Sequence, residues 1–424
     1  MEYLLRNIDS PNSAEITEYE KAGGYEGLKK ALKIDPKDLI ELVKKSGLRG
    51  RGGAGFPTGM KWMFASADPK FPKYLVCNAD EGEPGTFKDR PILEKNPHLL
   101  IEGMAISAHA LKSEKGYIYL RGEYPYAKTV LEKAIAQAYK RGYLGADILG
   151  SGIKFDLSVH QGAGAYICGE ETALIDSIEG RRGQPRIKPP FPVSVGLFGK
   201  PTIVNNVETL SNLPFIVEVG AEAYSKIGNP ECPGNKLFCI SGHVAKPGVY
   251  ELPMGTTLRD IIYGHAGGIK NGKALKAVIP GGISTPVFPP DKLDCPMDFV
   301  SVPKFGSMLG SGAVIVFDET TCLVRVTWRA LKFFEHESCG KCTPCREGTG
   351  WLRTVLERIE NGQGRPGDVE LLEDISKNIA GKTLCPLGDG AASVVMNFIK
   401  HFRGEFEGHL KGGCTFNAPE FRQA

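Results

Sequence analysis

The chain has 424 residues, a formal net charge of +3 and 42% hydrophobic residues. This length suits two to four domains, and the small net charge gives no field for nucleic acid or an anionic membrane surface. No apolar stretch is long enough to span a bilayer, and the N-terminus lacks the basic and apolar regions of a secretory signal. Eleven cysteines, several of them clustered, indicate a reducing compartment with a metal site.

Four regions follow one another along the chain. Residues 1 to about 48 are polar and helix-forming, and Asp35 followed by Pro36 predicts a helix start with Asp35 as its N-cap. Between residues 49 and about 225, glycine-rich turns alternate with apolar strands and helices. Strands are expected at 74–78 and 116–120 and a helix at 126–139. This alternation is typical of an α/β fold.

The second half has a different pattern. Strands are expected at 236–240, 248–251 and 313–317, with a short helix over 257–263, which indicates a small α+β domain at about 235–325. From residue 327 onward the pattern is helical, with proline- and glycine-rich breaks at 361–367 and 381–390.

A glycine-rich segment at residues 49–62 is the first candidate binding element. Five glycines in ten positions let backbone N–H groups approach an anion closely. Arg49, Arg51 and Lys61 add positive charge for phosphate, and Phe56 and Phe64 offer flat faces for a base or ring. The segment matches neither the dinucleotide fingerprint nor a Walker loop, so a flexible turn remains the alternative.

Acidic residues follow the expected strand at 74–78. Asp80, Glu81 and Glu83 lie beyond its carboxyl end, where α/β folds bind ligands and an acid can take ribose hydroxyls. Asn78 can hydrogen-bond the edge of a heterocycle. A solvated turn that tolerates three neighbouring acids is the alternative.

Two further segments carry polar groups at expected helix starts. Glycines at 162, 164 and 169 precede Glu170 and Glu171, whose charge suits the first turn of a helix, so that a well-capped helix is the structural alternative. A basic, proline-stiffened loop follows at 180–192, and Asn205 and Asn206 then begin another helix, a position that can bind phosphate.

Three thiols in the spacing C-x2-C-x2-C, Cys339, Cys342 and Cys345, suit three corners of a [4Fe–4S] cluster. A bacterial ferredoxin run would place its fourth cysteine at position 349, which is threonine here. Cys385, followed by proline, is the best candidate for the fourth ligand. A zinc site is the alternative, although zinc usually takes two separated pairs of ligands.

The other cysteines are less informative. Cys322, in a strand-like stretch, and Cys414, in the tail, are weaker candidates for the fourth ligand. Cys77, Cys168 and Cys239 have apolar neighbours in sequence and are expected to be small buried residues.

Taken together, segments 49–62, 78–90, 162–192, 202–210 and 337–348, with Cys385, resemble the NADH-binding flavoprotein subunits of respiratory complex I, which in bacteria are the F subunits. The resemblance covers nearly the whole chain. It implies an α/β, Rossmann-like FMN domain, then a ubiquitin-like β-grasp (SLBB) domain, then a C-terminal helical bundle carrying a [4Fe–4S] cluster. The boundaries expected are 1–60 for an N-terminal helical and glycine-rich segment, 61–230, 235–325 and 327–424.

The resemblance also assigns residues, all of which match the family pattern. The FMN contacts it implies are Gly50, Gly52, Lys61, Asn78, Asp80, Glu81, Tyr166, Gly169, Glu170, Asn205, Asn206 and Thr209. The NADH contacts it implies are Phe56, Lys61, Phe64, Glu83, Glu171 and Phe191. The cluster ligands are Cys339, Cys342, Cys345 and Cys385. No side chain is expected to be catalytic, because the cofactor carries the hydride chemistry.

The activity implied is NADH dehydrogenation, with hydride passing to FMN and single electrons passing to the cluster and on toward quinone. The implied partners are the thioredoxin-like [2Fe–2S] protein (the E subunit) and the large iron–sulfur protein (the G subunit), at the cytoplasmic face of a bacterial membrane and without contact with lipid. The diaphorase component of an NAD-linked hydrogenase or formate dehydrogenase is the alternative, although the start of this chain and the absence of any cysteine before Cys77 favour complex I. A non-catalytic iron–sulfur scaffold is the alternative of another class.

Overall fold

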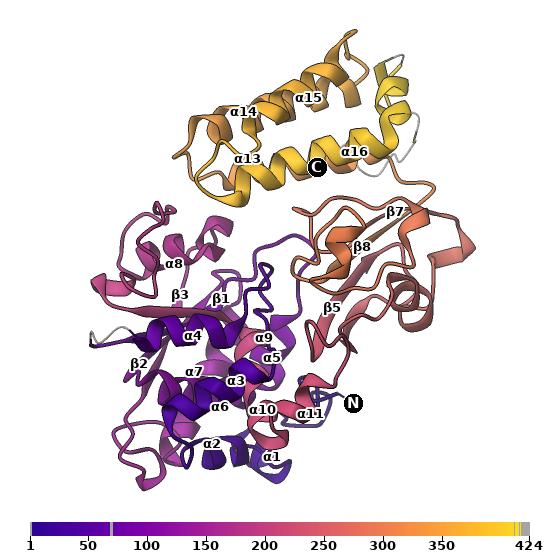
Figure 1. The fold of residues 1–424 in the computed structure, drawn as a ribbon. Helices are drawn as coiled ribbons and strands as arrows, with labels where there is room; N and C mark the ends of the chain where they lie inside the picture. The colour runs from indigo at the N-terminus through magenta and orange to yellow at the C-terminus, as the bar shows by residue number, and fades with distance from the viewer. Residues whose placement is uncertain (1, 68–70, 411, 415, 417–424) are drawn as a thin grey trace.

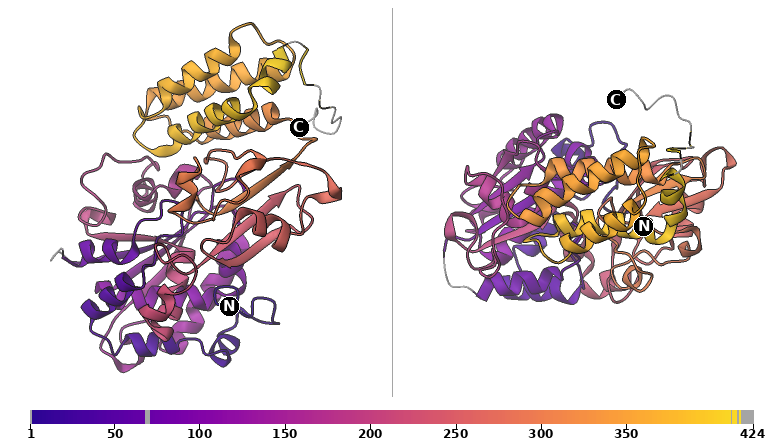
Figure 2. Two further views of the ribbon diagram at one scale, coloured as in Figure 1. Left: turned by 45° about the vertical axis from the view of Figure 1, so that its right-hand side comes forward. Right: turned by 90° about the horizontal axis from the view of Figure 1, so that it is seen from above.

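A computed structural model describes residues 2–67, 71–410, 412–414 and 416. Two sheets of different topology and a group of long helices follow one another along the chain. Figure 1 shows the helical C-terminal part lying above both sheet regions, and Figure 2 shows from a second side and from above that it spans across them.

The first sheet is entirely parallel. Its strands are β1 (Tyr74–Ala79), β2 (Lys115–Leu120), β3 (Asp156–Gln161) and β4 (Thr202–Asn206), in the order β3-β2-β1-β4. The strands predicted at 74–78 and 116–120 are confirmed, and the helix predicted at 126–139 is α7 (Pro125–Lys140). The chain adds β2 and β3 on one side of β1 and then places β4 on the other side of β1, so the direction of winding reverses and β1 and β4 flank the switch point. Such a switch point opens a crevice at the carboxyl ends of the strands.

Helices cover both faces of this sheet. Asp35 caps α3 (Pro36–Lys45) as predicted, its carboxylate accepting from the backbone N–H of Lys37 at 2.9 Å. The other helices of this region are α1 (Ile16–Lys21), α2 (Glu26–Ala31), α4 (Thr58–Ala67), α5 (Asp89–Lys95), α6 (Pro97–Leu111), α8 (Glu171–Ile178), α9 (Val207–Ser211), α10 (Leu213–Val219) and α11 (Ala221–Ser225).

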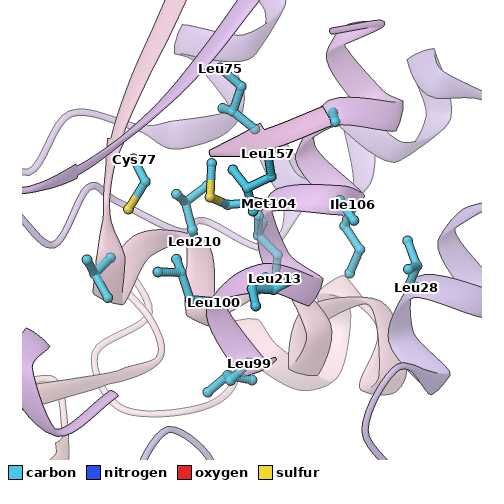
Figure 3. Close-up of a cluster of buried hydrophobic side chains, with 14 of the residues drawn as sticks. Leu28, Leu75, Cys77, Leu99, Leu100, Met104, Ile106, Leu157, Leu210 and Leu213 are labelled. Carbon is cyan, nitrogen blue, oxygen red and sulfur yellow. The ribbon is translucent and has the colours of Figure 1, made fainter. Parts of the chain in front are cut away.

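The alternation of side chains along β1 builds a separate core on each face. Leu75 and Cys77 point to the face covered by α6, where they pack in one cluster with Leu28 of α2, so the N-terminal helices share this core (Figure 3). Val76 points to the opposite face and packs in the cluster that contains Leu174 of α8. Cys77, Cys168 and Cys239 are buried, as predicted.

The second sheet is mixed. Its strands are β5 (Asn235–Gly242), β6 (Gly248–Pro253), β7 (Leu275–Ile279) and β8 (Ala313–Asp318), in the order β6-β5-β8-β7, and β5 is parallel to β8. The helix predicted at 257–263 is present: residues 258–259 are α-helical and continue directly into a π-helix, Asp260–His265. The backbone N–H groups of Leu258 and Arg259, which lack partners within the first turn, donate to the carbonyls of Cys295 and Leu293.

The C-terminal part is a bundle of α13 (Leu323–Glu337), α14 (Thr343–Glu360), α15 (Asp368–Ile379) and α16 (Pro386–Leu410). The break predicted at 361–367 is confirmed, whereas the second break is shorter than predicted because Pro386 begins α16. The prediction of a strand-like stretch at Cys322 is wrong, since this residue is the N-cap of α13. Within the described ranges, no helix is long and apolar enough to cross a membrane.

Candidate functional site

The polar segments singled out in the sequence meet at the switch point of the parallel sheet. β1 pairs with β4 in a register that places Asn78 opposite Asn206 at the carboxyl ends of both strands. The acidic run continues from β1, and α9 begins at the end of β4. Two segments more than 100 residues apart therefore border one crevice.

The glycine-rich segment is a closed loop held against α9. The N–H of Gly50 donates to the carbonyl of Phe56 at 2.8 Å, and the N–H of Arg51 donates to Thr209 Oγ1 at 2.8 Å. A Cβ at Gly52 would lie 3.1 Å from Cβ of Asn206, so glycine is what permits this close approach. The loop is fixed at both ends and is not a flexible turn.

The side chain of Arg51 does not serve the crevice. The expectation that it adds charge for a phosphate is wrong, because it is fully buried and its guanidinium donates to the carbonyl of Pro233 at 2.7 Å. The hydrogen bond from its backbone to Thr209 turns the residue inward. Lys61 lies beside the start of α8, with Nζ 3.0 Å from Glu171 and 2.9 Å from the carbonyl of Val204.

The acidic run is structured, and its three carboxylates do different things. Glu81 accepts from the backbone N–H of Asp89 at 2.8 Å and of Arg90 at 3.2 Å, so its side chain caps α5. Glu83 accepts from the hydroxyl of Tyr166 at 2.6 Å. The other oxygen of Glu83 accepts from the backbone and hydroxyl of a serine in the mixed-sheet region, Ser284, at 2.8 and 2.6 Å.

Asp80 is the acid left with a free acceptor. Its Oδ2 is buried and has no hydrogen-bond partner among the described residues, and burial raises the pKa of this carboxyl from about 3.8 to about 7. A buried acceptor without a donor is costly. The hydroxyl groups of a ribityl chain are donors of the kind it lacks, so this position fits a flavin nucleotide. Asn78 faces the same turn and donates to the carbonyl of Gly169 at 2.9 Å.

A charged cluster at the start of α8 borders the crevice. Glu170 is the N-cap of α8 and accepts from the N–H groups of Thr172 and Ala173. Lys188 lies 2.8 Å from Glu170 and 3.0 Å from Glu171. Burial disfavours the charged form of Glu171, but the neighbouring ammonium groups of Lys61 and Lys188 outweigh this effect and hold the pKa of Glu171 below its ordinary value. The well-capped helix and the polar site are therefore the same feature.

The two amides at the end of β4 hold the crevice in shape. Asn205 Oδ1 accepts from the indole of Trp62 at 3.0 Å, which fixes α4 against β4. Asn206 caps α9 and donates to Asp89 at 2.7 Å. Both side chains therefore fix the elements that border the crevice.

The three aromatic residues expected to stack on a nucleotide are exposed. Phe56, Phe64 and Phe191 keep 51%, 50% and 54% of their surface in contact with solvent. Large apolar side chains are usually buried, so three half-exposed rings on segments bordering the crevice are available to a planar ligand.

The four cysteines expected to hold the cluster come together at one end of the bundle. Burial and the neighbouring thiols of Cys339 and Cys342 raise the pKa of Cys345. Burial and the thiols of Cys339 and Cys345 likewise raise the pKa of Cys385 to about 11. The N–H of Leu384 donates to the sulfur of Cys342 at 3.3 Å. A donor set of four thiols fits an iron–sulfur cluster.

The cysteine loop lies directly against the crevice. The backbone N–H of Tyr166 donates to Glu337 at 2.9 Å, and Lys341 Nζ donates to the carbonyl of Pro185 at 2.6 Å. Arg182 donates to the carbonyl of Cys339 at 3.1 Å. Sequence patterns do not predict Ser284 as a partner of the site, because it acts through a contact between regions and carries no local motif. Glu337 lies in segment 337–348, but its hydrogen bond with Tyr166 forms only when two distant regions pack together.

The crevice, the exposed rings and the four thiols define an iron–sulfur flavoprotein of the NADH-oxidising class. Family models match in the same order: the Nuo51 FMN-binding domain over residues 43–215, an SLBB domain over 236–316, and the NADH-ubiquinone oxidoreductase-F iron-sulfur binding region over 325–409. The chain has both the FMN-binding and the [4Fe–4S]-binding regions.

Whole-length relatives give the particular family. The chain is 56% identical to the F subunit 2 of NADH-quinone oxidoreductase from Rhizobium meliloti, covering 98% of this chain and 99% of that protein. It is 50% identical to the F subunit of the Aquifex aeolicus enzyme, covering 97% and 95%. A chain of an NAD⁺-reducing [NiFe]-hydrogenase in its H₂-reduced state has a TM-score of 0.84 and 38% identity, covering 97% of this chain and 67% of that one. The chain belongs to the family of NADH-quinone oxidoreductase F subunits.

Proposed function

We propose that this chain is the NADH-oxidising flavoprotein component of a bacterial complex I, holding FMN in the crevice and a [4Fe–4S] cluster beside it. The observation that carries the proposal is the direct contact between the two sites. Hydrogen bonds from Tyr166 to Glu337 and from Lys341 to Pro185 join the turn that borders the crevice to the cysteine loop. Bound FMN supplies two chemistries, accepting hydride and releasing single electrons.

The role of the protein residues is to bind FMN and to orient it. The backbone at Gly50 and Gly52 lets a nucleotide approach closely, and Asp80 accepts from its hydroxyl groups. Asn78 and Gly169 frame the same turn. The remaining proposed FMN contacts are Lys61, Glu81, Tyr166, Glu170, Asn205, Asn206 and Thr209, of which the side chains of Glu81, Asn206 and Thr209 act through the scaffold.

The proposed NADH site lies at the outer side of the crevice. Phe56, Phe64 and Phe191 would stack on the planar groups of the dinucleotide. Lys61, Glu83 and Glu171 would meet its polar groups, with Glu83 already oriented by Tyr166 and Ser284. No side chain needs to act as a nucleophile or obligatory acid.

Cys339, Cys342, Cys345 and Cys385 are the proposed cluster ligands, and the cluster would lie on the path by which electrons leave the flavin. Membership of the complex I family implies partner proteins. We propose that these are the thioredoxin-like [2Fe–2S] E subunit and the large iron–sulfur G subunit, in a peripheral arm on the cytoplasmic face of the membrane. The proposed boundaries are 1–60, 61–230, 235–325 and 327–424.

The diaphorase of an NAD-linked hydrogenase is the second candidate, because a hydrogenase chain shares this fold at a TM-score of 0.84. Its 38% identity is lower than the 56% and 50% to the two complex I relatives, which favours complex I.

Purification from the native organism under anaerobic conditions tests the proposal. We expect a yellow-brown protein that reduces ferricyanide with NADH and co-purifies with two further iron–sulfur proteins and quinone-reducing activity. Co-purification with a nickel–iron hydrogenase would establish the diaphorase. A colourless protein without NADH oxidation after iron, sulfide and FMN are supplied would overturn both.

A further inference from the structure

The two cysteines that were weaker candidates for the iron–sulfur cluster lie together elsewhere in the bundle. Cys322 caps the start of α13, and Cys414 follows the end of α16. Glu360 at the end of α14 and His409 near the end of α16 complete a group whose ligand atoms all lie within 4.8 Å of one another. We propose that Cys322, Glu360, His409 and Cys414 form a structural zinc site.

The distances between these groups match the edges of a zinc tetrahedron. Cys322 Sγ lies 3.3 Å from His409 Nε2 and 3.5 Å from Glu360 Oε2, and His409 Nε2 lies 3.7 Å from that oxygen. With Zn–S of about 2.3 Å and Zn–N and Zn–O of about 2.1 Å, a tetrahedral ion gives edges of roughly 3.6, 3.6 and 3.4 Å. Two sulfurs, one imidazole and one carboxylate are a donor set that zinc accepts.

Neighbouring groups orient the ligands toward a common centre. His409 Nδ1 lies 2.7 Å from the carbonyl of Glu405, so this nitrogen carries the proton and Nε2 presents its lone pair to the group. Arg325 holds the other carboxylate oxygen of Glu360, Oε1, at 2.6 and 2.7 Å. The backbone N–H of Arg325 also donates to Cys322 Sγ at 3.3 Å. Outer partners of this kind are characteristic of metal sites.

The charges also balance. Zn²⁺ with two thiolates and one carboxylate carries a net charge of −1, and the guanidinium of Arg325 beside Glu360 neutralises it. Cys322, Glu360 and His409 are buried, and Cys414 is partly buried. Buried ionisable groups are usually paired or coordinate metals, which this arrangement allows for all four.

The site would stabilise the bundle and would take no part in electron transfer. Cys345 and Glu360 lie 15 residues apart on α14, about 22 Å at 1.5 Å per residue, so the site is at the opposite end of the bundle from the iron–sulfur thiols. Zinc has no redox chemistry. It would fasten the segment after α16 to the junction between β8 and α13.

Element analysis of the full-length holoprotein, produced with iron and zinc in the medium, tests the proposal. We expect one zinc per chain beside the cluster iron, and zinc K-edge absorption should give two sulfur and two nitrogen or oxygen neighbours. His409→Gln and Cys414→Ser should each lower zinc at least fivefold while iron and FMN stay at wild-type levels. Cys295→Ser, which alters a buried thiol of the mixed-sheet region, is the matched control.

Several results would overturn the proposal. These are wild-type protein with full iron and FMN but no zinc, zinc retained in both ligand variants, or a Cys322–Cys414 disulfide in protein purified anaerobically. Retained iron and FMN in the variants separate loss of zinc from misfolding. NADH oxidation in the wild type reports independently on the proposed function.

Discussion

Replacing Asp80 by asparagine should stabilise the flavin-free protein and weaken FMN binding. Burial raises the pKa of this carboxyl from about 3.8 to about 7, so the folded state binds a proton that the unfolded state releases between those values. The free energy of unfolding therefore falls as pH rises from about 4 to 7. At 1.36 kcal/mol per pH unit, the difference of about 3 between the two pKa values corresponds to at most ~4 kcal/mol.

Asparagine has a similar shape and does not ionise, so the fall in the free energy of unfolding between about pH 4 and 7 should disappear in the variant. At pH 8 the flavin-free variant should be about 2–4 kcal/mol more stable than wild type, and near pH 4 the two should be equal. FMN binding should weaken about tenfold, because hydrogen bonds to a charged acceptor are roughly twice as strong as neutral ones.

Urea unfolding of the flavin-free protein at several pH values measures the first effect, with the fluorescence of Trp62, which lies beside the crevice, as one reporter. Quenching of free FMN fluorescence measures the second. Asp38→Asn, an exposed position in the first turn of α3, is the control and should leave FMN affinity unchanged and lower stability by at most about 1 kcal/mol, the usual effect of a charge at a helix start. A variant with the same pH dependence as wild type would refute the burial of the Asp80 charge, and unchanged FMN affinity would refute its role as an acceptor.

Cys385→Ser should abolish the [4Fe–4S] signal in electron paramagnetic resonance while FMN and NADH-driven flavin reduction survive, and a variant that keeps its full signal would contradict the ligand assignment. Phe191→Ala should raise the KM for NADH by the equivalent of roughly 1–3 kcal/mol of stacking with unchanged FMN content; lost FMN at unchanged KM would place this ring against the flavin. Glu83→Gln should raise NADPH use relative to NADH at least tenfold in kcat/KM at low salt, about 1.4 kcal/mol, because a phosphate no longer meets a negative charge; an unchanged ratio would leave this acid a purely structural role. Lys236→Met should lower the free energy of unfolding by about 3–5 kcal/mol, because the fully buried carboxylate of Glu208, 2.7 Å away, loses one of its cations. Adding Glu208→Gln should restore part of this loss. A Lys236→Met variant with the wild-type unfolding midpoint would mean that the ion pair adds nothing to stability.

The fold class and the location of the chemistry could be predicted from the amino-acid sequence. Apolar runs indicated the strands at 74–78 and 116–120, and Asp35 before Pro36 indicated the start of α3. These signals are local, since a strand pattern, a cap or a C-x2-C-x2-C spacing is complete within a few residues. The family resemblance, which relatives at 56% and 50% identity support, rests on the same short segments.

The role of each side chain within those segments depends on the packed molecule. Three neighbouring acids look equivalent in sequence, yet one caps α5, one is held by Tyr166 and Ser284, and of the three only Asp80 keeps a buried oxygen without a described partner. Arg51 turns inward although its neighbours suggested a phosphate contact. Cys322, Glu360, His409 and Cys414 have no recognisable spacing, because the ends of three helices bring them together only when the bundle packs. Such roles depend on burial and on partners from distant segments, which no local pattern encodes.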